Sequence, residues 1–327
     1  MGHSGVMDPV TALPLLDPVF SLGEARRAGL TDHQLHGPRL TAPSRGLRMW
    51  AGTEPGWVDL ARALCQLEGD HCLSHVTAAR LWGIWLPTWM QDDERVHVTG
   101  RKETSGARRR PGVVGHRAKL APEDVVEVNG LRLTSPARTW LDLAPQLKDP
   151  LDLIAAGDAL LQRSDGPPRP EGVVGRNPLS TFRQIDAVLA RRRSVKGIQA
   201  ARQARPLLRE GVDSAPESRM RVVMVGAGLP EPVVNPMIVL GPGVWRQPDL
   251  GLLEWRLALQ YDGGGHAEQA QVNRDIWRDD DFDRHAWRTV RAGRDLYTAH
   301  GERAFLERVR RAMREQERRG FGPHSGS

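Results

Sequence analysis

Three acidic residues in the last third of the chain have a spacing that suits metal-dependent hydrolysis of a phosphodiester. Glu217 lies in a predicted helix, Asp249 follows Pro248 in a predicted strand, and Asp262 ends the next strand, just before a glycine run. Such hydrolysis needs carboxylates that converge on a divalent cation, because the cation acidifies its bound water and stabilises the developing charge. The alternative is that Asp249 and Asp262 only cap a strand end and a turn. Spacing alone leaves both interpretations open.

The strand that ends at Asp262 alternates in a way that sorts its side chains onto two faces. Leu257, Leu259 and Tyr261 share one face, so Gln260 and Asp262 share the other. If this strand forms a hairpin with the preceding one, Gln260 and Asp262 point toward Asp249. The sequence therefore places a third polar residue, Gln260, among the candidate site residues.

An α/β arrangement has to position these residues, and the last hundred residues predict one. The expected elements are a helix over 216–225, strands over 233–240, 246–252 and 256–262, a helix over 268–286, a strand over 288–291 and a basic helix over 301–319. Helix, three strands, helix, strand and helix, in that order, predict an α/β sandwich.

The N-terminal residues predict a smaller domain. Ser21 begins a helix that stops at Gly29, Thr31 begins a second helix through Leu40, and a turn leads into a strand over 47–50. This order is typical of a winged helix-turn-helix, in which the second helix and the wing contact DNA. The expected contact residues are His33, Gln34, His36, Arg45 and Arg48. The alternative is a small helical cap with ordinary surface polar residues.

The whole chain is therefore expected to be an α+β protein of several parts. These are a disordered or tag-derived start (1–16), a winged helix-turn-helix (17–56), a mixed α+β middle domain (57–163), a linker and helical connector (164–212), the α/β sandwich (213–320) and a tail (321–327). In the middle domain, Asn129-Gly130 is typical of a tight hairpin turn.

Charge and composition favour a polyanionic partner. The 327 residues carry a formal net charge of +6. Residues 213–320 contain 17 acidic and 17 basic residues, so the excess lies upstream, for example in Arg191 to Arg193. Cys65 and Cys72 are the only cysteines, too few for a disulfide framework or a four-thiolate zinc site. No secretory signal or membrane-spanning stretch is evident, and we expect a cytoplasmic protein that binds DNA and no organic cofactor.

Several motifs resemble a bacterial family related to the very-short-patch-repair endonucleases. They are Ser214-Ala-Pro-Glu-Ser-Arg-Met-Arg, Gln247-Pro-Asp-Leu, Leu259-Gln-Tyr-Asp-Gly with His266, Asn273-Arg-Asp-Ile-Trp-Arg-Asp, and Ala286-Trp-Arg-Thr-Val-Arg. Upstream, Cys72-Leu-Ser-His-Val-Thr-Ala-Ala-Arg-Leu-Trp-Gly and Leu133-Thr-Ser-Pro-Ala-Arg-Thr-Trp-Leu-Asp-Leu look like the N-terminal region of actinobacterial members. There the winged helix resembles that of abortive-infection type IV (AbiEi-like) antitoxins. The resemblance covers most of residues 17–300.

The resemblance implies a restriction-endonuclease-like fold with a PD-(D/E)xK site that uses Mg²⁺ or Mn²⁺. Carried over to this sequence, Asp249 is the central metal ligand and Glu217 a supporting acid. Asp262 and His266 complete the site or contact the scissile phosphate. Three arginines are expected near phosphates: Arg274, Arg278 and Arg291. The alternative for Arg274 and Arg278 is an ion-paired, solvated helix face.

One departure from the family pattern separates two functions. Where the family usually has Glu, this chain has Gln260. A carboxamide oxygen can still coordinate Mg²⁺, but the site loses a unit of negative charge. The chain is therefore expected to be either a metal-dependent DNA endonuclease, with Asp249, Gln260 and Asp262 as metal ligands, or a non-catalytic DNA-binding regulator on a nuclease fold. A homodimer is compatible with both.

Overall fold

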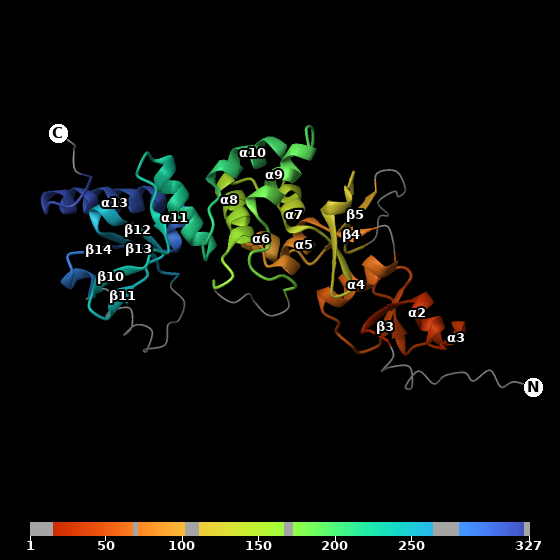
Figure 1. The fold of residues 1–327 in the computed structure, drawn as a ribbon. Helices are drawn as coiled ribbons and strands as arrows, with labels where there is room; N and C mark the ends of the chain where they lie inside the picture. The colour runs from red at the N-terminus through yellow and green to blue at the C-terminus, as the bar shows by residue number, and fades with distance from the viewer. Residues whose placement is uncertain (1–15, 68–70, 102–110, 167–172, 264–280, 324–327) are drawn as a thin grey trace, which may run out of the picture. The chain divides into compact units, whose positions relative to one another are not determined.

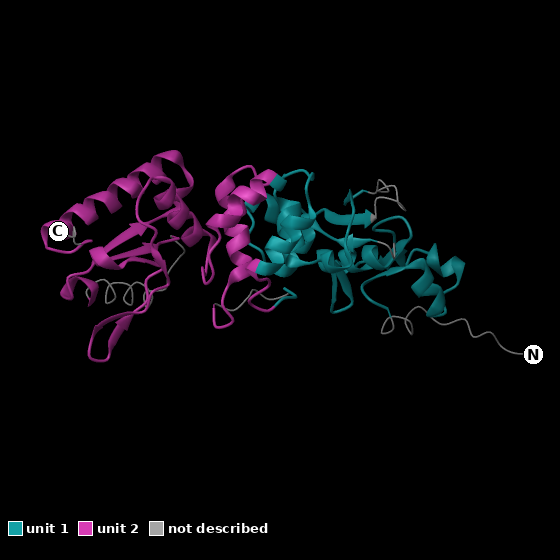
Figure 2. Cartoon of the chain, turned by 45° about the horizontal axis from the view of Figure 1, so that its top comes forward, with its two compact units in different colours: residues 1–146, 170–175, 183–198 teal, residues 147–169, 176–182, 199–327 magenta. Residues whose placement is uncertain are grey.

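The computed structural model describes residues 16–67, 71–101, 111–166, 173–263 and 281–323. The chain forms two compact units (Figure 2). Unit 1 comprises residues 1–146, 170–175 and 183–198, and unit 2 comprises residues 147–169, 176–182 and 199–327. Both units combine helices with strands, which confirms the predicted α+β class.

The two units follow boundaries that differ from the expected ones. Residues 147–163, expected in the middle domain, belong to unit 2. Their helix α8 (Pro150–Asp158) packs against α11 (Ala215–Gly226), to which it is joined by buried hydrogen bonds. Residues 183–198, expected in the connector, belong to unit 1. Each unit is consequently built from segments that are not contiguous in the sequence.

The first part of unit 1 is a small three-stranded sheet with two short helices. Its elements are β1 (Val19–Ser21), α2 (Leu22–Arg27), α3 (Asp32–Leu35), β2 (Leu40–Thr41) and β3 (Leu47–Trp50). The strand order is β1-β3-β2, with antiparallel pairs. Ser21 and Thr31 begin the two helices as expected, each in a reciprocal capping box. The second helix is shorter than expected, because Gly37 and Pro38 follow it and Leu40 pairs with Trp50.

The second part of unit 1 is a five-stranded sheet with helices packed on it. Its elements are α4 (Trp57–Leu67), β4 (Cys72–Leu73), α5 (His75–Trp82), α6 (Thr88–Gln91), β5 (Val96–Arg101), β6 (Val113–Ala118), η2 (Pro122–Asp124), β7 (Val125–Val128), β8 (Leu131–Thr134), α7 (Pro136–Leu143) and nearly all of α9 (Phe182–Arg191). The strand order is β6-β5-β4-β8-β7. Asn129 and Gly130 join β7 to β8 with φ angles of 52° and 72°, which confirms the predicted hairpin turn.

Unit 2 is an α/β structure whose core lies between one face of a sheet and two helices. Besides α8 and α11, its elements are η3 (Ala159–Leu161), most of α10 (Ile198–Ala204), η4 (Arg205–Leu207), β9 (Val233–Val234), β10 (Ile238–Gly241), β11 (Val244–Arg246), β12 (Leu250–Leu252), η5 (Leu253–Trp255), β13 (Leu257–Tyr261), β14 (Arg288–Ala292), η6 (Arg294–Tyr297) and α13 (Ala299–Arg318). The sheet has the order β14-β13-β12-β9, and β10 forms a separate hairpin with β11.

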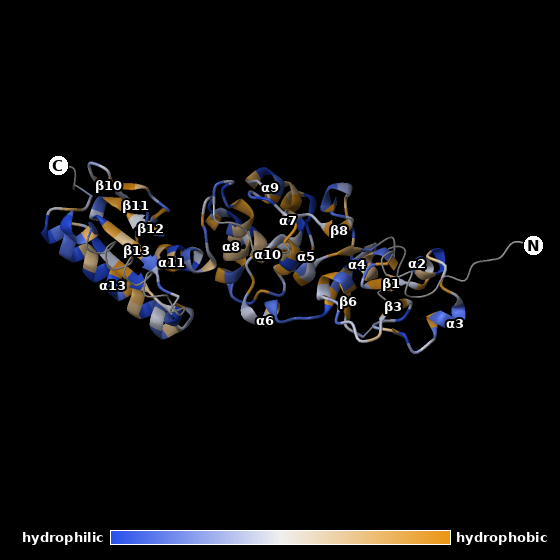
Figure 3. Ribbon diagram, turned by 90° about the horizontal axis from the view of Figure 1, so that it is seen from below, coloured by the Kyte–Doolittle hydropathy of each residue, from blue (hydrophilic) through white to orange (hydrophobic). Residues whose placement is uncertain are grey.

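The two faces of this sheet have different coverings. Met220 of α11 and Phe305 of α13 pack with Leu257 on one face. Ile238 of the β10–β11 hairpin packs with Ala258 on the other face, so the hairpin and α13 lie on opposite sides of the sheet (Figure 1). In Figure 3 the strands β12 and β13 are orange, while α13 is mostly blue because its outer face is charged.

The expected strand over 233–240 is two strands in the structure. Asn235 has a positive φ of 45° and Pro236 follows it, so the chain cannot continue as one strand. As a result β9 pairs with β12, while β10 pairs with β11. The helix expected over 268–286 lies largely outside the described residues.

Candidate functional site

The hairpin of β12 and β13 brings two of the predicted site residues together. Leu250 pairs with Leu259 in antiparallel register, so Asp249 lies one step further along, opposite Gln260. Directly opposite residues of an antiparallel pair project to the same face. The Oδ2 atom of Asp249 also accepts a hydrogen bond from the Tyr261 amide at 2.7 Å, which fixes the carboxylate at the end of the strand pair.

Gln260 is a buried polar residue whose side-chain amide is not fully hydrogen-bonded within the described part of the chain. Its exposed fraction is 5%, and within the described part of the chain its Nε2 atom has no hydrogen-bond partner. A buried donor that lacks a partner costs about 1–3 kcal/mol, so such groups in folded proteins call for an explanation. Gln260 therefore stands out in this sheet as much for its environment as for its sequence position.

Glu217 lies in the first turn of α11 and helps Ser214 to cap its start. Its Oε1 atom accepts a hydrogen bond from the Ser214 hydroxyl at 2.7 Å, and its Oε2 atom accepts one from the Asp213 amide at 3.0 Å. Burial, together with the charge of Asp249, raises the pKa of Glu217 to about 7. Glu217 is therefore within electrostatic reach of Asp249, although both of its oxygens serve the start of the helix.

This raised pKa makes a prediction about stability. Glu217 has an ordinary pKa near 4.5 and a folded pKa near 7, so the protonated carboxyl favours the folded state. This contribution to the unfolding free energy is complete below pH 4.5 and is lost as the pH rises to 7. Replacing Asp249 with Asn removes a repulsive charge and lowers the pKa of Glu217. We expect the loss of unfolding free energy between pH 5 and pH 8, measured by urea denaturation, to be smaller in Asp249→Asn than in the wild type. Each recovered pKa unit corresponds to about 1.4 kcal/mol.

The matched control for this prediction is Asp262→Asn, which removes an exposed carboxylate from the same region. We expect it to leave the pH dependence unchanged. Equal pH dependence in the wild type and Asp249→Asn would contradict the proposed coupling between Asp249 and Glu217.

Asp262 has different contacts from those of Asp249 and Glu217. Its side chain is 62% exposed, and its Oδ2 atom is 3.8 Å from Nη1 of Arg291. Its amide donates to the carbonyl of Ala292 at 2.7 Å, so Asp262 continues the pairing of β13 with β14. Arg291, which is expected to approach a phosphate, lies close to this carboxylate. The other C-terminal predictions, His266, Arg274 and Arg278, lie outside the described residues.

Among the described residues, the candidate ligands for a Mg²⁺ or Mn²⁺ ion all have other contacts. Asp249 faces an amide, Glu217 is occupied by the helix start, and Asp262 is beside Arg291. No three His, Cys, Asp or Glu side chains among the described residues are arranged to hold a metal ion. Hard divalent cations prefer several oxygen ligands that include carboxylates. The arrangement offers hydrogen-bonding groups, and fewer carboxylates than such cations usually take.

The N-terminal candidates fall into two groups. His33 and Arg45 are exposed, on α3 and in the turn before β3 respectively. His36 is exposed too, and its Nδ1 atom lies 2.8 Å from the carbonyl of Asp32. These three side chains are accessible from solvent.

The other two N-terminal candidates have structural partners. Oε1 of Gln34 accepts hydrogen bonds from the amide and hydroxyl of Thr31, at 2.8 and 3.0 Å. Arg48 donates its Nε to the carbonyl of Leu35 at 2.7 Å and its Nη1 to that of Leu47 at 2.8 Å. Gln34 thus completes the capping box at the start of α3, and Arg48 donates to a carbonyl at the C-terminal end of this helix.

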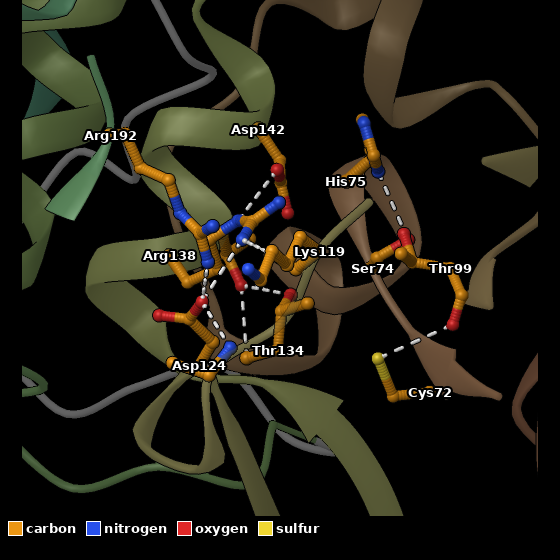
Figure 4. A network of polar contacts seen from close by, with 12 residues as sticks. Cys72, Ser74, His75, Thr99, Lys119, Asp124, Thr134, Arg138, Asp142 and Arg192 are labelled. Atoms are coloured by element: carbon orange, nitrogen blue, oxygen red, sulfur yellow. Dashed lines mark hydrogen bonds and ion pairs between the residues drawn. The ribbon is translucent and has the colours of Figure 1, made fainter. Parts of the chain in front are cut away.

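Part of the basic excess noted in the sequence is internal to unit 1. Asp124 is fully buried and pairs with Arg191. It also pairs with Arg192 and Arg138 (Figure 4). Arg138 also donates to Asp142 at 2.9 Å, and burial raises the pKa of Asp142 to about 6. Two of the three arginines at 191–193 therefore have a buried carboxylate as partner.

A histidine cluster in unit 1 was not predicted from the sequence. The rings of His75 and His116 stack with centroids 3.5 Å apart, and Nε2 of His116 lies 3.1 Å from Nδ1 of His97. The other nitrogen of His97 is 3.3 Å from Asp93. Burial lowers the pKa of His75 to about 2 and that of His116 to about 4, so both rings are neutral at pH 7.

This cluster has the features of a buried polar layer. The stacked rings are nearly parallel, at 12°, so their nitrogen lone pairs cannot converge on one ion without rotation. His75 begins α5, and the other two histidines lie on the neighbouring parallel strands β5 and β6. That pairing joins residues 19 positions apart and leaves no local signal in the sequence.

No helix in the described ranges is both long and apolar enough to cross a membrane.

Comparisons with known proteins place the chain in a family. No protein-family model matches the chain. The chain is 30% identical over 241 residues to "Uncharacterized protein Rv2248" and to "Uncharacterized protein MT2308", from two strains of Mycobacterium tuberculosis. Each match covers 71% of this chain and 79% of the mycobacterial protein. The chain belongs to the family of these mycobacterial proteins.

Proposed function

We propose that the chain is a cytoplasmic DNA-binding protein whose C-terminal sandwich has a restriction-endonuclease-like fold and holds DNA without hydrolysing it. The observation that carries this proposal is the pair at the end of β12 and β13. Asp249 lies opposite the amide of Gln260, at the position where the nuclease family that the sequence resembles usually has Glu. The nearby Asp262 lies beside Arg291.

The N-terminal part supports the DNA-binding half of the proposal. Its order β1-α2-α3-β2-β3, with the sheet order β1-β3-β2, agrees with a helix-turn-helix followed by a wing. His33 on α3 and Arg45 before β3 are exposed, as contacts to a duplex require. The net charge of +6 favours a polyanion as partner.

DNA binding is tested by fluorescence anisotropy of a labelled duplex at several salt concentrations. We expect the affinity to fall steeply as salt increases, because binding to phosphates releases counterions. Replacing Arg45 with Ala is expected to weaken binding several-fold and to reduce the salt slope by about 1. The matched control is Arg183→Ala, an exposed arginine on α9 outside the expected contact surface. Equal losses in both variants would remove the argument for the winged helix.

Cleavage is tested on supercoiled plasmid with Mg²⁺ or Mn²⁺. We expect the wild-type protein to leave the plasmid intact under conditions in which it binds DNA. Nicking that requires the metal and disappears in Asp249→Ala would overturn the non-cleaving proposal.

That outcome would establish the second candidate function, a metal-dependent endonuclease. Two observations favour it: Glu217 is buried within electrostatic reach of Asp249, and a carboxamide oxygen such as that of Gln260 is an acceptable ligand for a hard cation. The plasmid assay separates the two functions directly, because both of them predict DNA binding and only one predicts nicking.

A further inference from the structure

We propose that Gln260 makes unit 2 independent of metal. The neutral amide stands where a second carboxylate would require a bound cation, and the single substitution Gln260→Glu creates a divalent-cation site with Asp249. The inference deepens the proposed function, because it states why this fold holds DNA without a metal. Its main test, however, concerns metal binding and folding and does not depend on DNA.

The first step is the position of Gln260. It lies directly across the strand pair from Asp249, and its exposed fraction is 5%. A third carboxyl group, that of Glu217, is already buried within electrostatic reach of Asp249. Any further negative charge at position 260 would be introduced into a poorly hydrated region that already carries acids.

The second step is the cost of that charge. The amide of Gln260 is buried, and its Nε2 has no hydrogen-bond partner among the described residues. An unpartnered neutral amide is a moderate penalty, whereas a buried carboxylate without a partner is a much larger one. A Glu side chain at position 260 would therefore require either protonation or a cation. The natural residue avoids both requirements.

The third step is what a cation would gain. Two carboxylates on directly opposite strand positions are close enough to share one divalent ion, and oxygen ligands suit Mg²⁺ and Mn²⁺. An ion that binds the folded state and not the unfolded state stabilises the protein in proportion to its concentration. The wild type is expected to show no such stabilisation, and Gln260→Glu is expected to show it.

The experiment measures Mn²⁺ binding by the electron paramagnetic resonance signal of the free ion, and thermal unfolding with and without Mn²⁺. At pH 8, Gln260→Glu is expected to melt at a lower temperature than the wild type without metal and to recover with Mn²⁺. It is expected to bind Mn²⁺ at least about tenfold more tightly than the wild type, the order of effect that a single change around a metal site produces. The matched control is Gln247→Glu, an exposed glutamine two residues before Asp249, which should match the wild type.

A double variant keeps the inference testable if Gln260→Glu does not fold. Asp249→Asn with Gln260→Glu exchanges the acid and the amide across the strand pair, so one carboxylate again faces one amide. We expect the double variant to fold and to show no response to Mn²⁺. Equal Mn²⁺ binding by the wild type and Gln260→Glu would overturn the inference. So would a double variant that remains unfolded while Gln260→Glu folds without metal.

DNA binding in EDTA separates this inference from the proposed function. We expect the wild-type affinity for duplex DNA to be the same with EDTA and with Mg²⁺. A large loss in EDTA would contradict metal independence. If the wild type binds no DNA under either condition while the Mn²⁺ results hold, the proposed function fails and the role of Gln260 stands.

Discussion

Replacing Arg221 with Met is expected to destabilise unit 2 by about 3–5 kcal/mol. Arg221 is 1% exposed, and its Nη2 atom donates to Asp158 at 3.0 Å and to the carbonyl of Leu207 at 2.7 Å. Asp158 is itself fully buried, so the variant leaves a carboxylate inside the protein without its cation. Urea denaturation monitored by tryptophan fluorescence or circular dichroism measures the loss.

The comparison for this prediction is Arg209→Met. Arg209 pairs with Glu231 at 2.7 Å, but both side chains are more than a third exposed. A pair of this kind contributes about 0–1 kcal/mol. Similar losses in the two variants would show that the burial of Arg221 and Asp158 does not set the cost of breaking their ion pair.

Replacing Gly301 with Ala is the second large effect that we expect, about 3 kcal/mol or more. Gly301 lies in the first turn of α13, and a methyl group there would come within 2.0 Å of the carbonyl oxygen of Asp295 in η6. The clash is with backbone, so a side-chain rotation cannot relieve it, and either α13 or η6 has to move. Thermal unfolding measures the resulting loss of stability.

The control for Gly301 is Gly226→Ala at the end of α11. No atom lies within 4 Å of the added methyl group there, apart from the helix and the neighbouring residues. Alanine favours helix over glycine by up to about 1 kcal/mol, so this variant is expected to be as stable as the wild type or slightly more stable. A neutral Gly301→Ala would show that the start of α13 is able to shift without cost.

Local patterns in the sequence predict several of these elements correctly. Alternation over 257–262 put Gln260 on the face that the observed register turns toward Asp249. Ser21 and Thr31 begin their helices, and Asn129-Gly130 forms its turn. Each of these features depends on residues within a few positions of one another, which is why a short window of sequence contains enough information.

The features that the sequence did not predict depend on distant partners. Nothing in the local sequence indicates that Glu217, Arg219 and Arg221 are all buried. Their burial is possible because Asp149 and Asp158, some 60 to 70 positions earlier, supply the carboxylates for the arginines. Asp262 likewise could not be assigned from spacing, because its neighbour Arg291 arrives from a parallel strand 29 positions later.

The interleaved course of the chain has a consequence for how this protein can evolve. Arg221 in the C-terminal sandwich depends on Asp158, and Asp124 in unit 1 depends on Arg191 and Arg192, which come later in the sequence than Asp158. A single genetic crossover at any point between residues 158 and 191 would therefore separate both buried carboxylates from these arginine partners. A variant that exchanges its C-terminal half for another would therefore have to restore partners for both Asp124 and Asp158.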